Sequence, residues 1–240
     1  MKKEFKSMLS ALMALIMLLT VISAPACKNS GPDISKAKIG DTLTFGVYEQ
    51  DNNESNGKEK IEWYVLDKKD SAVLLISKYA IECRPFNTDY AAVAWDACTL
   101  RKWLNEDFIN EAFNESERAR IKTTPVVAAK NPSYDSNPGN DTEDRIFILS
   151  IDEAEKYFVS NEERMSEPTE RASADGLWIG AYSQQLANGG NTVMWWLRSP
   201  GGSDRYAAAV RNGGAVGRYG NAVNELFCGV RPVLWLAPRS

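Results

Sequence analysis

The C-terminal stretch WWLRSPGGSDRYAAAVRNGGAVGRYGNAVNELFCGVRPVLWL, residues 195–236, decides how this chain folds. It begins and ends with apolar, β-branched and aromatic segments, 195–198 and 229–236, which are typical of buried strands. Between them lies a run of Gly, Ala, Asn, Arg, Ser, Asp and Tyr, and its dipeptide Asn212-Gly213 is a strong signal for a hairpin turn. The stretch therefore predicts several short strands that carry a small, polar, turn-rich surface.

The sequence upstream of this stretch changes from strand patterns to helix patterns. Residues 43–50 alternate like a strand, and the apolar segments Ile61–Asp67 and Ser71–Ile81 are predicted to pair as a hairpin. Apolar residues at helical spacing predict an amphipathic helix, or two short ones, within 98–113. Residues 145–150 form an apolar run that predicts a buried strand.

Two capping boxes mark further helix starts, at Asn114–Glu117 and Ser150–Glu153. Residues 160–176 are polar and are predicted to form a loop. The order is thus strands, then helices, then many short strands. This order predicts an α+β fold, with short antiparallel strands and two or three helices packed on one side.

The N-terminus has the pattern of an export signal. Residues 1–26 combine three lysines, an apolar segment too short to span a bilayer comfortably, and small residues at the end. Cys27 follows at once, which favours a bacterial lipoprotein whose lipidated cysteine becomes the new N-terminus. Residues 27–38 then form a polar tether, and 39–240 form one domain. We expect a membrane-anchored protein of the cell surface; the alternative is simple secretion after cleavage behind Ala26.

Composition excludes several classes of function. Without residues 1–26 the basic count falls from 28 to 25 and the acidic count from 32 to 31, a net charge near −6. This balance argues against nucleic acid as a partner. Histidine is absent, which excludes Ser-His-Asp triads, Cys-His pairs and His-ligated zinc. The acidic group Asp141, Glu143 and Asp144 lacks calcium-loop spacing and is predicted to be a solvated loop, so we expect no metal and no cofactor.

Three cysteines and two arginines have a structural and a functional interpretation each. Cys83, Cys98 and Cys228 are predicted to be buried thiols; a Cys83–Cys98 disulfide is the alternative. Arg198 and Arg231 lie in strand-like sequence, where a buried guanidinium needs a carboxylate or several carbonyls. We expect both to hold the structure together; contact with a ligand is the alternative.

The motifs WWLRSPG and GVRPVLWL resemble the signature of a domain-of-unknown-function family in surface proteins and lipoproteins of Gram-positive bacteria. FGVYEQ, IEWYVLD, LRKWLNEDF and IFILSIDEAEKYF occur upstream in the expected order, so the resemblance covers Ile39–Ala237. It implies a C-type lectin-like fold, similar to the formylglycine-generating enzymes and to the variable proteins of diversity-generating retroelements. The paired cysteines of those enzymes are missing beside Cys228, and so are the calcium motifs of true lectins. The resemblance therefore implies a binding domain and no enzyme.

The variable proteins suggest what the run 201–225 does. In them, residues of the types found here form a displayed surface between rigid ends, much as in antibody paratopes. The surface is either fixed or diversified by a retroelement. We expect it to bind a protein or a glycan; a formylglycine-type enzyme and a structural envelope protein without a ligand are the alternatives. The predicted binding residues are Ser203, Asp204, Arg205, Tyr206, Arg211, Asn212, Arg218, Tyr219, Asn221 and Asn224.

Overall fold

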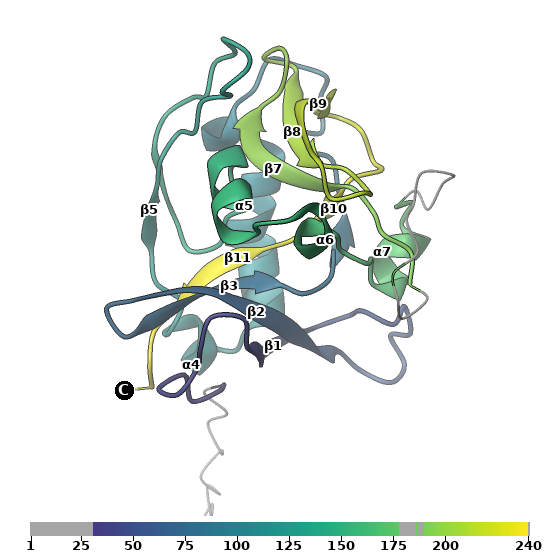
Figure 1. Cartoon of the computed structure of the whole chain (residues 1–240). Helices are drawn as coiled ribbons and strands as arrows, with labels where there is room; N and C mark the ends of the chain where they lie inside the picture. Colours follow the sequence, from purple (N-terminus) through teal and green to yellow (C-terminus); the bar gives the residue numbers. More distant parts are fainter. Residues whose placement is uncertain (1–30, 178–185, 187–189, 240) are drawn as a thin grey trace, which may run out of the picture.

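The computed structural model describes residues 31–177, 186 and 190–239; the predicted signal peptide 1–26 and Cys27 lie outside this part. The described residues are mostly β, with 31% in strands and 19% in helices. Its strands form a four-stranded, a five-stranded and a two-stranded sheet (Figure 1). The strands are β1 (Thr42–Tyr48), β2 (Glu59–Lys69), β3 (Ala72–Ser77), β4 (Glu82–Cys83), β5 (Thr124–Val126), β6 (Thr142–Asp144), β7 (Trp195–Pro200), β8 (Tyr206–Val210), β9 (Val216–Ala222), β10 (Gly229–Val230) and β11 (Val233–Leu236).

The four-stranded sheet has the order β1-β2-β3-β11, and all its neighbours are antiparallel. The predicted hairpin within 61–81 is confirmed as β2–β3, which a tight turn at Asp70-Ser71 joins. Both turn residues have positive φ, as a type I′ turn requires. All six residues of β3 are buried, so this strand is covered on both faces.

The five-stranded sheet has the order β4-β10-β7-β8-β9. Strands β7, β8 and β9 form an antiparallel meander, and β10 pairs in parallel with β7. The inner strands β7 and β8 are almost wholly buried, whereas the edge strand β9 is mostly exposed or half-buried. The predicted polar surface thus lies at the edge of a rigid, buried support.

The C-terminal segment 229–236 is divided between the two large sheets. Strand β10 pairs with β4 and β7, and β11 pairs with β3. Arg231, which is 1% exposed, lies at the crossing and donates to the Ser77 carbonyl oxygen from Nε at 3.0 Å and from a terminal nitrogen at 2.8 Å. Its guanidinium lies 4.9 Å from the centroid of a Trp195 ring. Arg231, Ser77 and Trp195, called the crossing below, connect the two sheets.

The helices are short, and some continue one another. The stretch 99–112 is one helical run with a π segment in its middle, and both predicted capping boxes are formed. The predicted loop 160–176 holds two short helices instead, so that prediction was wrong. The helical segments are η1 (Trp95–Ala97), α2 (Thr99–Trp103), η2 (Leu104–Phe108), α3 (Ile109–Ala112), α4 (Glu115–Arg118), α5 (Ile151–Tyr157), α6 (Asn161–Arg164) and α7 (Glu170–Ala174).

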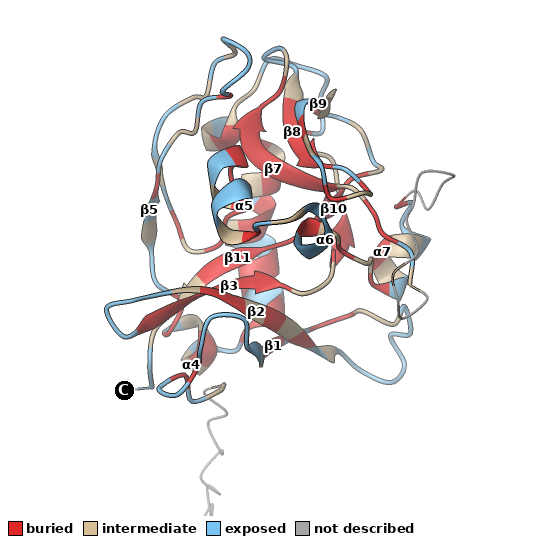
Figure 2. Cartoon of the chain, in the orientation of Figure 1, coloured by how far each residue is buried: buried red, intermediate tan, exposed pale blue. Residues whose placement is uncertain are grey.

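The predicted fold class, an α+β C-type lectin-like fold with two or three helices packed on one side, was wrong. The protein is mostly β with several sheets and few helices. The helical run 99–112 passes behind β11 while α5 lies in front, so the helices do not form one layer (Figure 1). The buried residues concentrate on the strands (Figure 2). Helical residues such as Leu104, Phe108 and Ile109 are buried in the same core cluster as the strands, so the helices pack into the core of the sheets.

The apolar run 145–150 was also interpreted wrongly. Ile146 to Leu149 are buried as expected, but the segment makes only an isolated bridge, between Phe147 and Val233 of β11. An apolar run indicates burial; it does not show whether the backbone finds a partner strand along its length.

Packing begins before Ile39. Ile34 is 1% exposed and Ala37 is 5% exposed, so the described part of the segment predicted as a tether contacts the core. Lys68 of β2 donates to the Ala37 carbonyl oxygen at 2.5 Å. No helix in the described residues combines the length and the apolar character needed to cross a bilayer.

Candidate functional site

The site is built on the β8–β9 hairpin, the outer part of the five-stranded sheet. Its strands pair from Tyr206 opposite Ala222 to Val210 opposite Val216. The turn predicted around Asn212-Gly213 is confirmed, with the Arg211 amide donating to the Ala215 carbonyl oxygen at 2.9 Å. The turn is held against α6, because Arg164 donates from Nε to the Gly214 carbonyl oxygen at 2.8 Å.

Four tyrosines gather at the other end of this hairpin. The Tyr206 and Tyr219 ring centroids lie 5.3 Å apart, and the Tyr219 and Tyr134 centroids lie 5.8 Å apart. Tyr90 adjoins Tyr206 through a side-chain hydrogen bond, and the Arg205 guanidinium lies 5.4 Å from the Tyr90 ring centroid. Tyr90, Tyr134 and Tyr219 are each 40% to 53% exposed. These four tyrosines and Arg205 are called the tyrosine face below.

Backbone contacts beneath the tyrosine face hold it in place. The Gly202 amide donates to the Tyr219 carbonyl oxygen at 2.7 Å, and a Cβ at Gly202 would collide with the Tyr219 ring. Asn131 donates from Nδ2 to the carbonyl oxygens of Pro200 at 2.8 Å and Arg218 at 2.7 Å. These two hydrogen bonds connect the loop that carries Tyr134 to β7 and to β9. The face is therefore organised before any ligand binds.

The tyrosine face is uncharged except for Arg205. The pKa of Tyr206 lies above its usual value, first because of the charge and hydrogen bond of Tyr90 and then because of Tyr219. Tyr206 therefore stays a neutral phenol at neutral pH, able both to donate and to accept hydrogen bonds.

Several predicted residues surround this face. Ser203, Asp204 and Arg205 are exposed in the loop before β8, and Asn224 is exposed just after β9. Asp204 accepts a hydrogen bond from the Asn137 amide at 2.8 Å, which ties this loop to the Tyr134 loop. Ser203, Asp204 and Arg205 thus lie side by side in the exposed loop that leads into Tyr206 of the face.

Other predicted residues lie apart from the face or are occupied. Arg211 is exposed in the turn at the opposite end of the hairpin. Asn212 is 5% exposed and donates to the Thr192 carbonyl oxygen at 3.3 Å, so it belongs to the structure and not to a surface. Arg218 is exposed but pairs with Glu155 of α5 at 2.7 Å.

Asn221 is half-buried, and its amide lies 3.5 Å from the Cys228 sulfur. It points toward the interior of the sheet. Prediction from residue type alone could not separate such inward residues from outward ones, because the bulge between Ala207 and Ala209 shifts the alternation of the hairpin.

Tyr90 and Tyr134 were missed by the sequence analysis. Both lie in loops far from the hairpin in sequence, and no periodic pattern connects them to Tyr206 or Tyr219. The available signal was weak: a single tyrosine in a polar segment rich in Asn, Asp and Ser.

The described cysteines are free and buried, as predicted. Burial raises the pKa of Cys83 and Cys98 to about 12 each. Burial likewise raises the pKa of Cys228, which is fully buried. Such thiols are poor nucleophiles. Cys27, the predicted lipidation site, lies outside the described residues.

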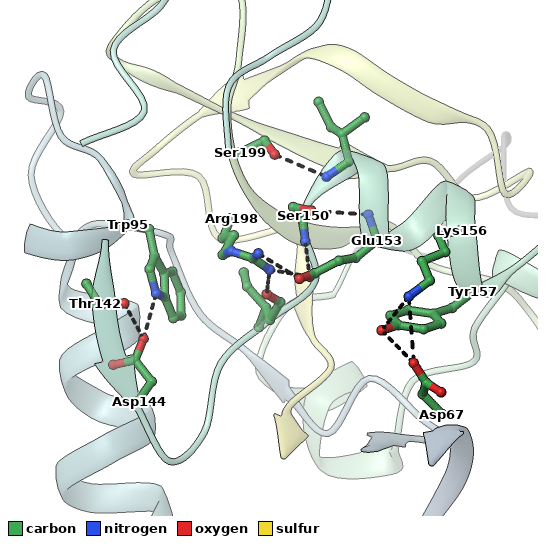
Figure 3. Close-up of polar contacts among 12 residues, drawn as sticks. Asp67, Trp95, Thr142, Asp144, Ser150, Glu153, Lys156, Tyr157, Arg198 and Ser199 are labelled. Carbon is green, nitrogen blue, oxygen red and sulfur yellow. Dashed lines mark hydrogen bonds and ion pairs between the residues drawn. The ribbon is translucent and has the colours of Figure 1, made fainter. Parts of the chain in front are cut away.

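The prediction that Arg198 holds the structure together is confirmed. Figure 3 shows its guanidinium on the Glu153 carboxylate of α5, with one contact at 2.8 Å, and it also donates to the Ile148 carbonyl oxygen at 2.9 Å. Burial alone would raise the pKa of Glu153, but the hydrogen bond and charge of Arg198 outweigh it and hold that pKa below its usual value. Arg231 has the same structural role at the crossing.

The prediction of a solvated acidic loop was wrong for Asp144, which is 1% exposed. Its carboxylate accepts from Trp95 Nε1 at 2.9 Å, as Figure 3 shows, and from Arg101 Nε at 2.7 Å. Neighbouring charges in a sequence do not reveal that one of them pairs with an arginine on a helix.

One group of described carboxylates has the spacing of a metal site. Oxygens of Glu49, Asp51 and Glu59 lie within 4.8 Å of one another. Backbone amides account for part of their bonding: Glu59 accepts from Gln50 at 2.7 Å and Glu49 from Asn53 at 2.8 Å. Exposed acidic groups are common without an ion, so this cluster by itself assigns no metal.

Comparison with known proteins adds one result. No curated protein and no solved structure matches this chain. Residues 70–238, which contain β3 to β11 and the whole tyrosine face, match the model of a family described as a domain of unknown function (DUF6273). Because the match spans more than half of the sequence, the chain belongs to the DUF6273 family.

Proposed function

We propose that this protein is a lipoprotein of the bacterial cell surface that binds a protein ligand through its tyrosine face, without catalysing a reaction. The observation that carries the proposal is the cluster of four partly exposed tyrosines, drawn from three separate segments and joined by Arg205. Lipidation at Cys27 would hold the domain at the membrane surface.

The chemistry of the face suits a protein partner. Tyr and Arg contribute most to binding energy in protein interfaces, and Tyr loses little conformational entropy when it binds. The neighbouring Ser203, Asp204 and Asn224 are short polar side chains of the kind that adapt their hydrogen bonds. Because Gly202 and Asn131 fix the backbone beneath the rings, little ordering is needed on binding.

Two observations favour binding over catalysis. The sequence has no histidine, and the described cysteines are buried thiols with raised pKa values. The formylglycine-type alternative expected Cys228 to open into a cleft, and burial of this residue disfavours it.

The proposal treats the face as a fixed surface. Diversification by a retroelement was implied by resemblance to proteins with a C-type lectin-like fold, and this chain has a different one. Within 201–225, Ala207 to Val210 and Asn212 are buried, so these positions tolerate little change. Sequencing the gene from many isolates tests the point: substitutions confined to template adenines, with a template copy nearby, would establish diversification and contradict a fixed surface.

Binding assays with matched variants test the function. We expect surface proteins from the same cells to include one that binds the wild-type chain, with affinity reduced about tenfold or more by Tyr219→Ala or Tyr206→Ala. Val159→Ala, at a residue 84% exposed in another part of the chain, should bind like wild type. If the wild-type chain binds only a glycan on an array, and the tyrosine variants do not bind it, the ligand of the face is a glycan and not a protein. Equal binding by all variants would overturn the proposed face.

The lipid anchor has its own test. Cys27→Ser should move the protein from the membrane fraction to the medium and abolish incorporation of labelled fatty acid. Unchanged membrane association would contradict the anchor while leaving the binding face untouched.

A further inference from the structure

A cavity of about 360 Å³ lies between the end of β1, the 54–58 loop, β4, α3 and α7. Its wall is highly charged, with four glutamates, two arginines, one lysine and the Tyr48 hydroxyl. None of these residues belongs to the tyrosine face. The cavity is polar where ligand pockets are usually apolar, so its chemistry depends on which charges are already paired.

Two cations of the wall already have acidic partners. Lys58 Nζ lies 3.1 Å from the Glu111 carboxylate. Arg171 lies 2.9 Å from Asp175, which is outside the wall, and 3.6 Å from Glu54. Neither Lys58 nor Arg171 is therefore left as a free positive charge in the cavity.

Arg84 supplies a positive end whose ion pair with Glu82 is long. Its guanidinium stacks 4.4 Å from the centroid of a Trp103 ring, and its nearest carboxylate oxygen, from Glu82, is 3.7 Å from Nε. The buried Nε has no hydrogen-bond partner. Glu82 also accepts a hydrogen bond from the Tyr48 hydroxyl at 2.7 Å. The terminal nitrogens of Arg84 form a planar fork that matches a carboxylate.

Glu49 supplies an unbalanced negative end. It is 7% exposed, and its carboxylate lies within 4.8 Å of those of Asp51 and Glu59. Among the described residues no lysine or arginine forms an ion pair with any of the three, and their described hydrogen-bond donors are uncharged amides. Three carboxylates this close repel one another, and a cation beside them would relieve that repulsion.

We propose that this cavity binds a small zwitterion with a free carboxylate and a free ammonium group, an amino acid or a dipeptide. The carboxylate lies on the Arg84 fork and the ammonium beside Glu49. The cavity volume exceeds that of a single small amino acid, which leaves room for one peptide unit between the two ends. This site is independent of the proposed function, since it shares no residue with the tyrosine face.

Calorimetric titration of the full chain with L-alanine, L-alanyl-L-alanine, and its N-acetylated and amidated forms tests the proposal. We expect the free dipeptide or the free amino acid to bind, and each blocked dipeptide to bind about tenfold or more weakly, because each lacks one charge-assisted hydrogen bond. The tighter binder of the two free compounds shows whether the ligand is an amino acid or a dipeptide. Absence of binding by both, or equal binding by a blocked form, would overturn the proposal.

Variants assign the two ends. Arg84→Gln should weaken the free dipeptide about tenfold but leave the amidated form unchanged, because that form has no carboxylate to lose. Glu49→Gln, which keeps an acceptor for the Asn53 amide, should act in the same way toward the ammonium group. Lys69→Gln, at an exposed strand end, is the charge-matched control.

A thermal unfolding curve checks that each variant folds. If Glu49→Gln does not fold, the binding of the free dipeptide by Arg84→Gln tests the site alone. Arg84→Gln that binds the free dipeptide like wild type would overturn the site. So would calcium binding that Glu49→Gln abolishes while zwitterions do not compete, since the cluster would then belong to a metal.

Discussion

The crossing and the tyrosine face each contain a guanidinium beside an aromatic ring, but the pair is buried at the crossing and exposed on the face. At the crossing, the Arg231 guanidinium lies 4.9 Å from a Trp195 ring and both residues are buried. On the face, the Arg205 guanidinium lies 5.4 Å from the Tyr90 ring and both residues are exposed. Both arginines come from the stretch 195–236, so composition alone does not distinguish their roles.

Burial makes the difference. An exposed cation–π contact contributes about 0.5–1 kcal/mol, and water remains available to either partner. Arg231 is buried away from water, and burial lowers its pKa to about 9. Among the described residues, the Ser77 carbonyl oxygen and the neighbouring aromatic rings compensate for the lost water. Loss of such compensation is costly, whereas loss of the exposed pair is not. The crossing therefore determines stability, and the face remains free to serve recognition.

The largest expected effect is at the crossing. Arg231→Ala removes two hydrogen bonds to Ser77, leaves that carbonyl oxygen unpaired and opens a cavity beside Trp195. We expect a loss of about 3–4 kcal/mol in the free energy of unfolding, measured by urea titration. Arg205→Ala, the matched change on the face, should lose less than about 1 kcal/mol. Equal losses would mean that burial does not make the Arg231 pair more important for stability than the Arg205 pair.

The next effect is at the Arg198–Glu153 pair, which supports β7 beneath the face. Glu153→Gln leaves the Arg198 charge, 4% exposed, without its carboxylate, and should lose about 2–3 kcal/mol at neutral pH. Because the pKa of Glu153 is lowered in the folded state, its contribution is complete above the unfolded pKa, near 4.5, and disappears as pH falls through the folded pKa. Urea titrations at several pH values should therefore show wild type and variant converging as the pH falls below about 4.5. A gap that stays constant would contradict the ionic role of Glu153.

The strands and turns that patterns mark locally were predictable from sequence. The hairpin β2–β3, the turn at Asn212-Gly213 and the capping boxes at Asn114 and Ser150 all depend on residues next to one another in the chain. The association of β10 with one sheet and β11 with another was not predictable. A strand pattern does not name its partner, and Arg231-Pro232 marks the division only once the crossing is seen.

The same limit applies to the candidate site. Tyr206 and Tyr219 were predicted because both belong to the polar run 201–225, and their ring centroids lie 5.3 Å apart. Tyr90 and Tyr134 reach the face through loops whose path depends on Asn131 and Asp204, and neither contact has a local signal. Asn212 fits the composition of a polar surface but is buried, because a turn amide satisfies a nearby carbonyl as readily as it faces water.

A smaller effect is expected at the hairpin turn, which lies at the end opposite the face and contacts α6. Gly214 and Gly57 both have positive φ, but a Cβ at Gly214 would collide with the Asn161 backbone, whereas one at Gly57 meets nothing within 4 Å. Gly57→Ala should lose about 1 kcal/mol through backbone strain, and Gly214→Ala about 2 kcal/mol. Thermal unfolding of both variants measures the difference. Indistinguishable melting temperatures would show that α6 moves away without cost.

The smallest effect on stability is expected on the face itself. Tyr219 is 53% exposed and contacts Tyr134 and Tyr206 through its ring, so Tyr219→Ala should lose less than about 1 kcal/mol in the free energy of unfolding. Its near-native stability, measured by urea titration, would make any loss of ligand a direct effect on binding. A loss above about 2 kcal/mol would instead make the ring a structural support, as Trp195 is at the crossing, and the distinction between the two regions would fail.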